Sequence, residues 1–294
     1  MNRRTPLWWR VLIVLVNRLP QVALSRVVGR LADLKLPRFL RRPVLAGFAL
    51  LVGIDRSEVE LDLPEYPSLG AFFVRRLRPG ARPMADDQHA IVSPVDGRLA
   101  EFGVIESGRL IQAKGLAYEV ADLLDDPGGG DRFEGGVFIT IYLSPKDYHR
   151  IHAPCAGSVV RARHVPGRLF PVNRPAVALV PNLFVRNERV VCHLEGACGQ
   201  AAVVAVGALN VGRISCCFDP PWNGTGGGVT NRSGKAAETR VYAPPVPCAR
   251  GDEIMAFHLG STVVMLFEAG HVSLLSDLES GRFVRLGEVL ATAL

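Results

Sequence analysis

The chain lacks the cysteine patterns by which several classes of small stable protein are recognised. Only six cysteines occur in 294 residues, and no two of them form a Cys-x-x-Cys pair. This spacing is typical neither of a disulfide framework nor of a zinc ribbon. We therefore expect reduced cysteines and a cytosolic environment.

Long apolar runs and nucleotide-binding motifs are also missing. The two longest early apolar runs, residues 11–16 and 44–54, fall short of the roughly 20 residues that a membrane-crossing helix needs. Arg10 interrupts the apolar stretch that a signal peptide requires, so we expect neither export nor a transmembrane helix. Glycine clusters at 128–130 and 226–228 match neither a phosphate-binding loop nor Gly-x-Gly-x-x-Gly, so they do not predict nucleotide binding.

Positive charge is concentrated at the N-terminal end. Residues 1–56 contain eleven Lys or Arg against two Asp, which gives a net charge of +9, whereas the whole chain carries +6. The remaining 57–294 are therefore slightly acidic, at −3. An anionic partner is expected to meet the protein at its N-terminal fifth.

The same basic region has helical periodicity. Apolar residues recur with helical spacing at Leu24, Val27, Val28, Leu31 and Leu34. Basic residues fall on the opposite face, and a second pattern with tryptophan near one end precedes Pro20. Basic amphipathic helices of this kind are typical of anionic membrane surfaces. The alternative is that these apolar faces pack on the protein itself.

From about residue 88, short β-rich runs are separated by Gly, Pro and Asn. Clear examples lie at 136–143, 158–165, 202–206 and 262–267. Because helical patterns come first, we predict an α+β fold. It consists of a helical, basic, membrane-associating region at 1–60 and a β-rich, mainly antiparallel body at 61–294.

Two segments combine reactive side chains in a way that suggests chemistry. In 93–97, Asp96 precedes a glycine, which also predicts an ordinary hairpin turn. His149 and His152 lie three residues apart after a β-rich run, and imidazole titrates near neutrality, so the pair suits proton transfer unless both are plain surface residues. With Cys155 they could offer three metal ligands, but zinc needs a fourth protein ligand or an open catalytic position. We predict no metal.

A third segment, residues 258–264, places Ser261 after Gly260 at the entrance to a β-branched run. An ordinary strand start is one interpretation. The other is a nucleophile on backbone that glycine leaves free to adopt strained geometry. Leu259 and Val263 stand where the Gly-x-Ser-x-Gly elbow of hydrolases has glycine, so this is not that elbow. Asp, His and Ser from separate segments can still converge as orienter, base and nucleophile.

Taken together, the segments resemble the membrane-associated, pyruvoyl-dependent phosphatidylserine decarboxylases of bacteria and mitochondria. Seven stretches in the family's order carry the resemblance, at 72–83, 93–97, 112–115, 142–154, 165–173, 182–189 and 259–262. It implies a proenzyme that cuts its own chain at Gly260–Ser261. The products would be a β chain of 1–260 and an α chain of 261–294, whose Ser261 becomes the covalent pyruvoyl cofactor.

The resemblance also implies a role for each matching residue. Asp96, His152 and Ser261 correspond to the self-cleavage triad, and His149 to the histidine of the decarboxylation step. His152, held by Asp96, would be the base for attack of Ser261 Oγ on the preceding carbonyl, and elimination and hydrolysis would then leave the ketone and release ammonia. That ketone would form a Schiff base with the substrate amine and accept electrons as CO₂ leaves. Protonation by His149 would give phosphatidylethanolamine, a step of phospholipid biosynthesis.

The implied partners are phosphatidylserine, an anionic membrane surface and the two chains of one precursor, with a homodimer as the expected assembly and no nucleic acid. The implied location is peripheral, on the cytoplasmic side of the cell membrane. Three alternatives stay open: a serine hydrolase of lipid esters that uses the same three residues, a non-catalytic membrane-binding protein, and a related enzyme for another serine-headed lipid. An intact chain would favour the hydrolase.

Overall fold

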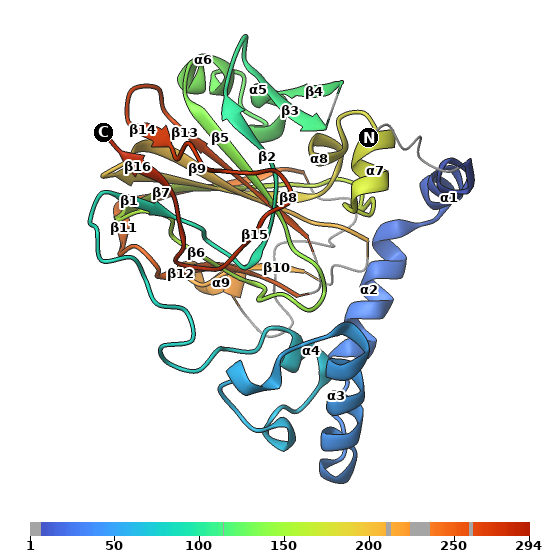
Figure 1. Ribbon diagram of the computed structural model, residues 1–294. Coiled ribbons are helices and arrows are strands. Elements are labelled where there is room, and N and C mark those ends of the chain that lie inside the picture. The colour runs from blue at the N-terminus through green and yellow to red at the C-terminus, as the bar shows by residue number, and fades with distance from the viewer. Residues whose placement is uncertain (1–6, 114, 210–212, 224–235, 259–260) are drawn as a thin grey trace.

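The computed structural model describes residues 7–113, 115–209, 213–223, 236–258 and 261–294. Helices form the N-terminal part of the chain and strands dominate the rest (Figure 1). The predicted α+β class, with helices before a mainly antiparallel body, is thus confirmed. The N-terminal elements are α1 (Leu7–Arg18), α2 (Gln21–Ala32), α3 (Arg38–Val52), the 3-10 helices η1 (Arg56–Glu58) and η2 (Leu63–Glu65), and α4 (Leu69–Phe73).

Pro20 separates the first two helices, because proline has no N–H with which to continue α1. Among the described residues, no single helix is long and apolar enough to cross a membrane. The first two helices together reach the length and hydropathy of a span, but they are bent by 86° at the break.

The predicted apolar stripe forms α2 but faces away from the protein. Val27 and Leu31 are 51% and 61% exposed, whereas Gln21 and Ser25 on the other face are buried. Gln21 donates to the Val16 carbonyl at 2.9 Å and accepts from the Leu169 amide at 2.9 Å. These bonds satisfy the buried amide, so the polar face of α2 can pack on the body. The alternative that the stripe packs on the protein is wrong for Val27 and Leu31.

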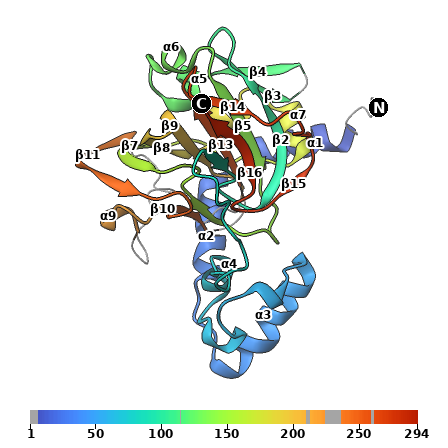
Figure 2. The same cartoon turned by 60° about the vertical axis from the view of Figure 1, so that its left-hand side comes forward.

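A small separate core holds α3. It ends at Gly53, whose φ of 84° is a left-handed conformation that glycine adopts without strain. The inner face of α3 packs on residues of the 3-10 helices and α4, and the buried members are Leu45, Ala49, Ile54, Val59, Tyr66 and Phe72. Figures 1 and 2 show α3 and α4 projecting below the sheets. The proposed domain boundary at residue 60 stays a prediction.

One antiparallel sheet of eight strands organises the body. Its order is β11-β7-β8-β9-β13-β5-β2-β15. The bounds are β2 (Gly97–Val104), β5 (Val137–Tyr142), β7 (Gly157–Val165), β8 (Arg189–Gly196), β9 (Gly199–Val206), β11 (Glu238–Cys248), β13 (Thr262–Phe267) and β15 (Phe283–Val284). The expected runs at 136–143, 158–165, 202–206 and 262–267 therefore coincide with four of these strands.

Smaller sheets and short helices complete the body. Two three-stranded sheets have the orders β1-β16-β14 and β10-β12-β6, and β3 pairs with β4. Their bounds are β1 (Ala90–Val92), β3 (Arg109–Ala113), β4 (Leu116–Glu119), β6 (Arg150–His152), β10 (Ile214–Cys216), β12 (Glu253–Phe257), β14 (Val272–Leu274) and β16 (Val289–Ala293). The helices are α5 (Val120–Leu124), α6 (Gly129–Phe133), α7 (Arg174–Leu179), α8 (Leu183–Arg186) and α9 (Pro220–Asn223).

The most enclosed strand is β13, which lies between β9 and β5. All six of its residues pair with both neighbours, and all six are buried. A strand covered on both faces favours apolar side chains, which explains the continuous run Val-Val-Met-Leu-Phe after Thr262. The start of β13 is thereby held rigidly inside the sheet.

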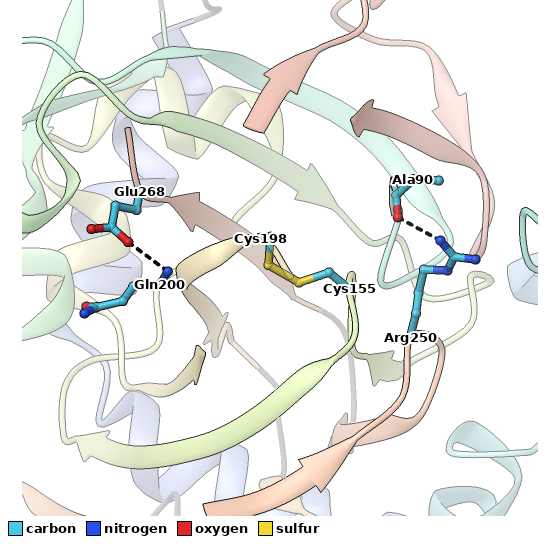
Figure 3. The surroundings of a disulfide bond; sticks show 6 residues. All are labelled: Ala90, Cys155, Cys198, Gln200, Arg250 and Glu268. Carbon is cyan, nitrogen blue, oxygen red and sulfur yellow. Dashed lines mark hydrogen bonds between the residues drawn. A yellow bond between two sulfur atoms is a disulfide. The ribbon is translucent and has the colours of Figure 1, made fainter. Parts of the chain in front are cut away.

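The expectation of reduced cysteines is wrong for two of the six. Cys155 and Cys198 form a disulfide between the segment after β6 and the turn between β8 and β9 (Figure 3). Gly157 and Gly196 bring these segments together, because a Cβ on either would meet opposing backbone at about 2.5 Å or less. The partners are 43 residues apart, and only the pairing of β7 with β8 makes them neighbours.

Candidate functional site

Ser261 immediately precedes β13 and is completely buried. Its carbonyl accepts a hydrogen bond of 2.9 Å from the Leu143 amide, at the end of β5. Its hydroxyl has no hydrogen-bond partner among the residues that the structure describes. Buried hydroxyls are normally hydrogen-bonded, so this one is exceptional among the described residues. The predicted scissile partner Gly260, with Leu259, lies outside the described residues.

His152 is the last residue of β6 and His149 directly precedes that strand, and β12 connects this segment to Ser261. His152 ends β6, which pairs antiparallel with β12, and the Phe257 amide donates to the His149 carbonyl at 2.9 Å. Phe257 is the last residue of β12, only four positions before Ser261. The structure thus brings the histidine segment beside the segment that leads to the serine.

His149 is a completely buried neutral imidazole. Its Nδ1 lies 2.8 Å from the Asp147 carbonyl oxygen, which can only accept, so Nδ1 carries the proton. Its Nε2 has no partner within the described part of the chain. Burial, then the charge of Arg75, lowers its pKa to about 3, although the Asp147 carbonyl opposes the shift. The ring packs on Phe73 at 4.2 Å between centroids. An unpaired basic nitrogen is therefore available inside the site.

His152 is also buried, and its ring stacks on Tyr148 with centroids 5.6 Å apart. Burial lowers its pKa, and the negative charge of Glu253 partly offsets this effect. Its amide donates to the Pro94 carbonyl at 2.9 Å, which ties β6 to the 93–97 segment. Its Nδ1 has no partner among the described residues.

Asp96 is held by groups other than His152. Arg82 donates to both of its carboxylate oxygens at 2.6–3.1 Å, and the Leu286 amide donates at 2.8 Å. The same arginine also binds Glu58. The structure brings the Asp96 segment next to His152 through Pro94, but in the described residues it shows no hydrogen bond between the two side chains. The triad roles stay a prediction, and Arg82 is a neighbour that sequence reasoning missed.

A cavity of about 330 Å³ opens beside the start of β13. Thr262, Tyr142 and Arg98 lie in one row across β13, β5 and β2, and all three line it. Thr262 is 1% exposed, and its hydroxyl has no partner within the described ranges. Arg174 at the start of α7 also lines this cavity, as do apolar residues such as Phe184. The lining therefore combines two arginines with one carboxylate, Glu101, and several apolar side chains.

Gln112 fixes the helical wall of this cavity. Its side-chain amide donates to the carbonyls of Val177 and Val180 and accepts from the Leu183 amide, at 2.7–2.8 Å. These three bonds hold α7 and α8 against β3. The motif 112–115 had drawn attention to this glutamine, but only the pairing of distant strands could indicate that Arg98 and Arg174 share its cavity.

A further histidine, the half-buried His258, stands three residues before Ser261. Its Nε2 lies 3.1 Å from the hydroxyl oxygen of Ser215, and burial lowers its pKa to about 3. Sequence reasoning placed this residue in the motif without giving it a role. Among the described residues, no group of three or more His, Cys, Asp or Glu side chains is placed to hold a metal ion.

Comparisons with known proteins agree on one family. The family model described as phosphatidylserine decarboxylase matches residues 69–292. A phosphatidylserine decarboxylase proenzyme of Anaeromyxobacter sp. (strain K) is 46% identical over 286 residues, which is 97% of this chain and 99% of that protein. Proteins of the same name from Myxococcus xanthus and Ectopseudomonas mendocina are 39% and 41% identical and cover 93% and 97% of this chain, and 95% and 98% of their own.

Proposed function

The chain belongs to the phosphatidylserine decarboxylase family, and on that premise we propose that it makes a pyruvoyl group from Ser261 and uses it to convert phosphatidylserine to phosphatidylethanolamine and CO₂. The observation that carries the proposal is the buried hydroxyl of Ser261 just before β13, which has no hydrogen-bond partner in the described part of the chain. Such a group fits a covalent carbonyl cofactor, because the position is fixed by backbone pairing and closed to water. The pyruvoyl ketone supplies an electrophile for the substrate amine and an electron sink for decarboxylation.

In self-cleavage, His152 takes the proton of Ser261 Oγ as the hydroxyl attacks the Gly260 carbonyl and an ester replaces the amide. Burial supports this role, since a histidine with a lowered pKa is unprotonated at neutral pH and free to accept a proton. Asp96 is already bound by Arg82 and Leu286, so in the uncut chain it orders the 93–97 segment. The hydrogen bond from the His152 amide to the Pro94 carbonyl then fixes the backbone of the base relative to this segment.

In decarboxylation, His149 delivers the proton to the carbon that loses CO₂. Its Nδ1 proton is committed to the Asp147 carbonyl, so Nε2 is the nitrogen that exchanges a proton. At neutral pH it starts without one, because burial and Arg75 disfavour the charged form. The substrate carries a phosphate and a carboxylate, and nearby negative charge favours imidazolium. Substrate binding therefore favours the protonated form of His149.

The cavity beside Thr262 accepts the substrate headgroup. Arg98 and Arg174 supply positive charge for the phosphate, and guanidinium groups suit phosphate oxygens by geometry as well as charge. Arg98 is oriented by donating to the Gly281 carbonyl at 3.0 Å. The apolar lining near Phe184 suits the glycerol and the first acyl carbons.

The protein binds the cell membrane as a peripheral protein. The net +9 of residues 1–56 attracts anionic lipid, and the exposed stripe of α2 provides apolar surface. To test this, we would float the chain with vesicles after Val27→Ser and Leu31→Ser together. Val241→Ser removes a residue that is equally apolar and 74% exposed on β11, so it is the matched control. Undiminished flotation of the α2 double variant would remove α2 from the membrane contact.

Intact mass measurement tests the chemistry. We expect two fragments, 1–260 and 261–294, and no free amino group on the shorter one. Ser261→Ala should stay whole and inactive. Thr262→Val removes the adjacent buried hydroxyl and should still be cut, which separates the serine's chemistry from a general packing effect. A wild-type chain that decarboxylates phosphatidylserine while remaining whole would refute the proposal.

A further inference from the structure

A second basic cavity lies away from Ser261, at the base of α3. Its volume is about 270 Å³, and it is enclosed by α3, the two 3-10 helices and the segment after α4. Three arginines, Arg42, Arg56 and Arg78, line it together with one carboxylate, Asp62, and apolar residues such as Leu63. The cationic groups therefore outnumber the acidic one by three to one.

These three arginines differ from neighbouring arginines because their guanidinium groups still have N–H donors for a ligand. Arg41 donates to the carbonyls of Leu36 and Pro64, and Arg82 is shared between two carboxylates. By contrast, the structure gives no ion pair to any of the three cavity arginines within the described ranges. Arg78 is held through Nε, which donates to the Val59 carbonyl at 2.9 Å, and both of its terminal nitrogens remain for a ligand. A fixed guanidinium of this kind is suited to phosphate.

The cavity lies beside a strongly exposed apolar surface on α3. Phe39, Leu50 and Leu51 are 78%, 86% and 83% exposed on the outer side of α3, opposite the buried Leu45. At 100° per residue, Arg42 lies roughly 60° around the helix from Phe39. Arg42 therefore lies between the outward apolar face of α3 and the body of the protein. When such a face enters a lipid surface, a residue in this position is level with the lipid phosphates.

We infer that this cavity binds the phosphate of an anionic phospholipid while the outer face of α3 enters the acyl layer. The inference rests on the proposed contact with a membrane, and it is independent of the chemistry at Ser261. Free phosphate esters offer the same chemical group, but the neighbouring apolar face favours a lipid. The bound lipid is a docking ligand, distinct from the substrate in the cavity beside Thr262.

The test compares two pairs of substitutions in the full chain. Arg42→Gln with Arg56→Gln removes two cavity arginines, and Arg30→Gln with Arg38→Gln removes the same charge from exposed positions of α2 and α3 that do not line the cavity. Vesicles of phosphatidylcholine with phosphatidylglycerol provide the anionic lipid. Phosphatidylglycerol has no serine headgroup to decarboxylate. In each variant, appearance of the 261–294 fragment indicates that the chain has folded and that Ser261 has reacted. This readout is separate from the vesicle affinity.

General attraction lowers affinity equally in the two pairs, since both lose two charges. If the cavity binds phosphate, the Arg42/Arg56 double variant should lose about tenfold more vesicle affinity than the control pair. Soluble dihexanoyl phosphatidylglycerol should bind the wild type saturably, more tightly than inorganic phosphate, and should not bind the cavity pair. Equal vesicle affinities of the two pairs would overturn the inference. Equal binding of inorganic phosphate and the short-chain lipid would overturn it too, by indicating a free-phosphate site.

Discussion

Mild acid should destabilise the uncut chain through its buried histidines. The pKa of His193 is lowered from 6.5 to about 3, chiefly by burial and then by the charge of Arg161. Below pH 6.5 the unfolded chain binds a proton at this residue and the folded chain does not, so stability is present above 6.5 and is lost as the pH falls. The loss is about 1.4 kcal/mol per pH unit, which makes about 2 kcal/mol at pH 5.

The pKa values of His149 and His258 are likewise lowered to about 3, in both cases chiefly by burial. The three sites together should cost about 6 kcal/mol at pH 5, against a total stability of about 5–15 kcal/mol for a typical domain. Urea unfolding of the Ser261→Ala chain at pH 7.5 and 5.0 measures the loss. His193→Gln keeps an acceptor for Arg161 and should reduce the loss by about 2 kcal/mol.

The matched control is His271→Gln, because the side chain of His271 is 47% exposed. It should leave the pH dependence of the parent unchanged. The difference between the His193 variant and its parent cancels contributions from other groups, including Asp147 and Glu101, whose pKa values burial raises. If the His193 variant loses as much stability as the parent between the two pH values, the reasoning from burial is refuted.

Three further predictions concern the site and the disulfide. His149→Ala should still be cut but should lose about 100-fold or more in kcat, whereas His152→Ala should stay whole; denaturing gels and CO₂ release measure both, and the opposite pattern would exchange the two roles. Arg98→Gln with Arg174→Gln should raise KM for phosphatidylserine in mixed micelles more than it lowers kcat, and an unchanged KM would remove both from phosphate binding. Cys155→Ser opens a closed loop of 43 residues and should lower the free energy of unfolding by about 4 kcal/mol, so equal urea midpoints for the variant and its parent would contradict the expected effect.

The elements that sequence predicted best are those whose burial is locally periodic or continuous. The run at 262–267 became β13 without a change of bounds, because a fully buried strand is apolar at nearly every position. The stripe from Leu24 to Leu34 predicted α2, although its last member lies beyond the end of the helix at Ala32. The sequence pattern could not predict which side of α2 faces the body. Gln21 on that side is bonded to Val16 and Leu169, and Leu169 is 148 residues away in the sequence.

The candidate site was predicted as residue types but not as a network. Asp96, His149, His152 and Ser261 could be named because motifs carry them, and the structure brings their segments together through backbone bonds. The clamp of Arg82 on Asp96 has no local signal, because it depends on how residues 58–82 fold back over the body. The same reason explains why the Cys155 disulfide and the second wall of the Thr262 cavity were not predicted.

The two-sided pairing of β13 determines what cleavage at Ser261 would leave behind. The 34-residue piece from 261 to 294 contains β13, an inner strand of the large sheet. It also supplies β14 and β16 to the three-stranded sheet that they form with β1. Pulling it out would require breaking full-length ladders on both edges of β13. The nicked protein should therefore migrate as one interlocked particle under native conditions, and only denaturation should release the small piece.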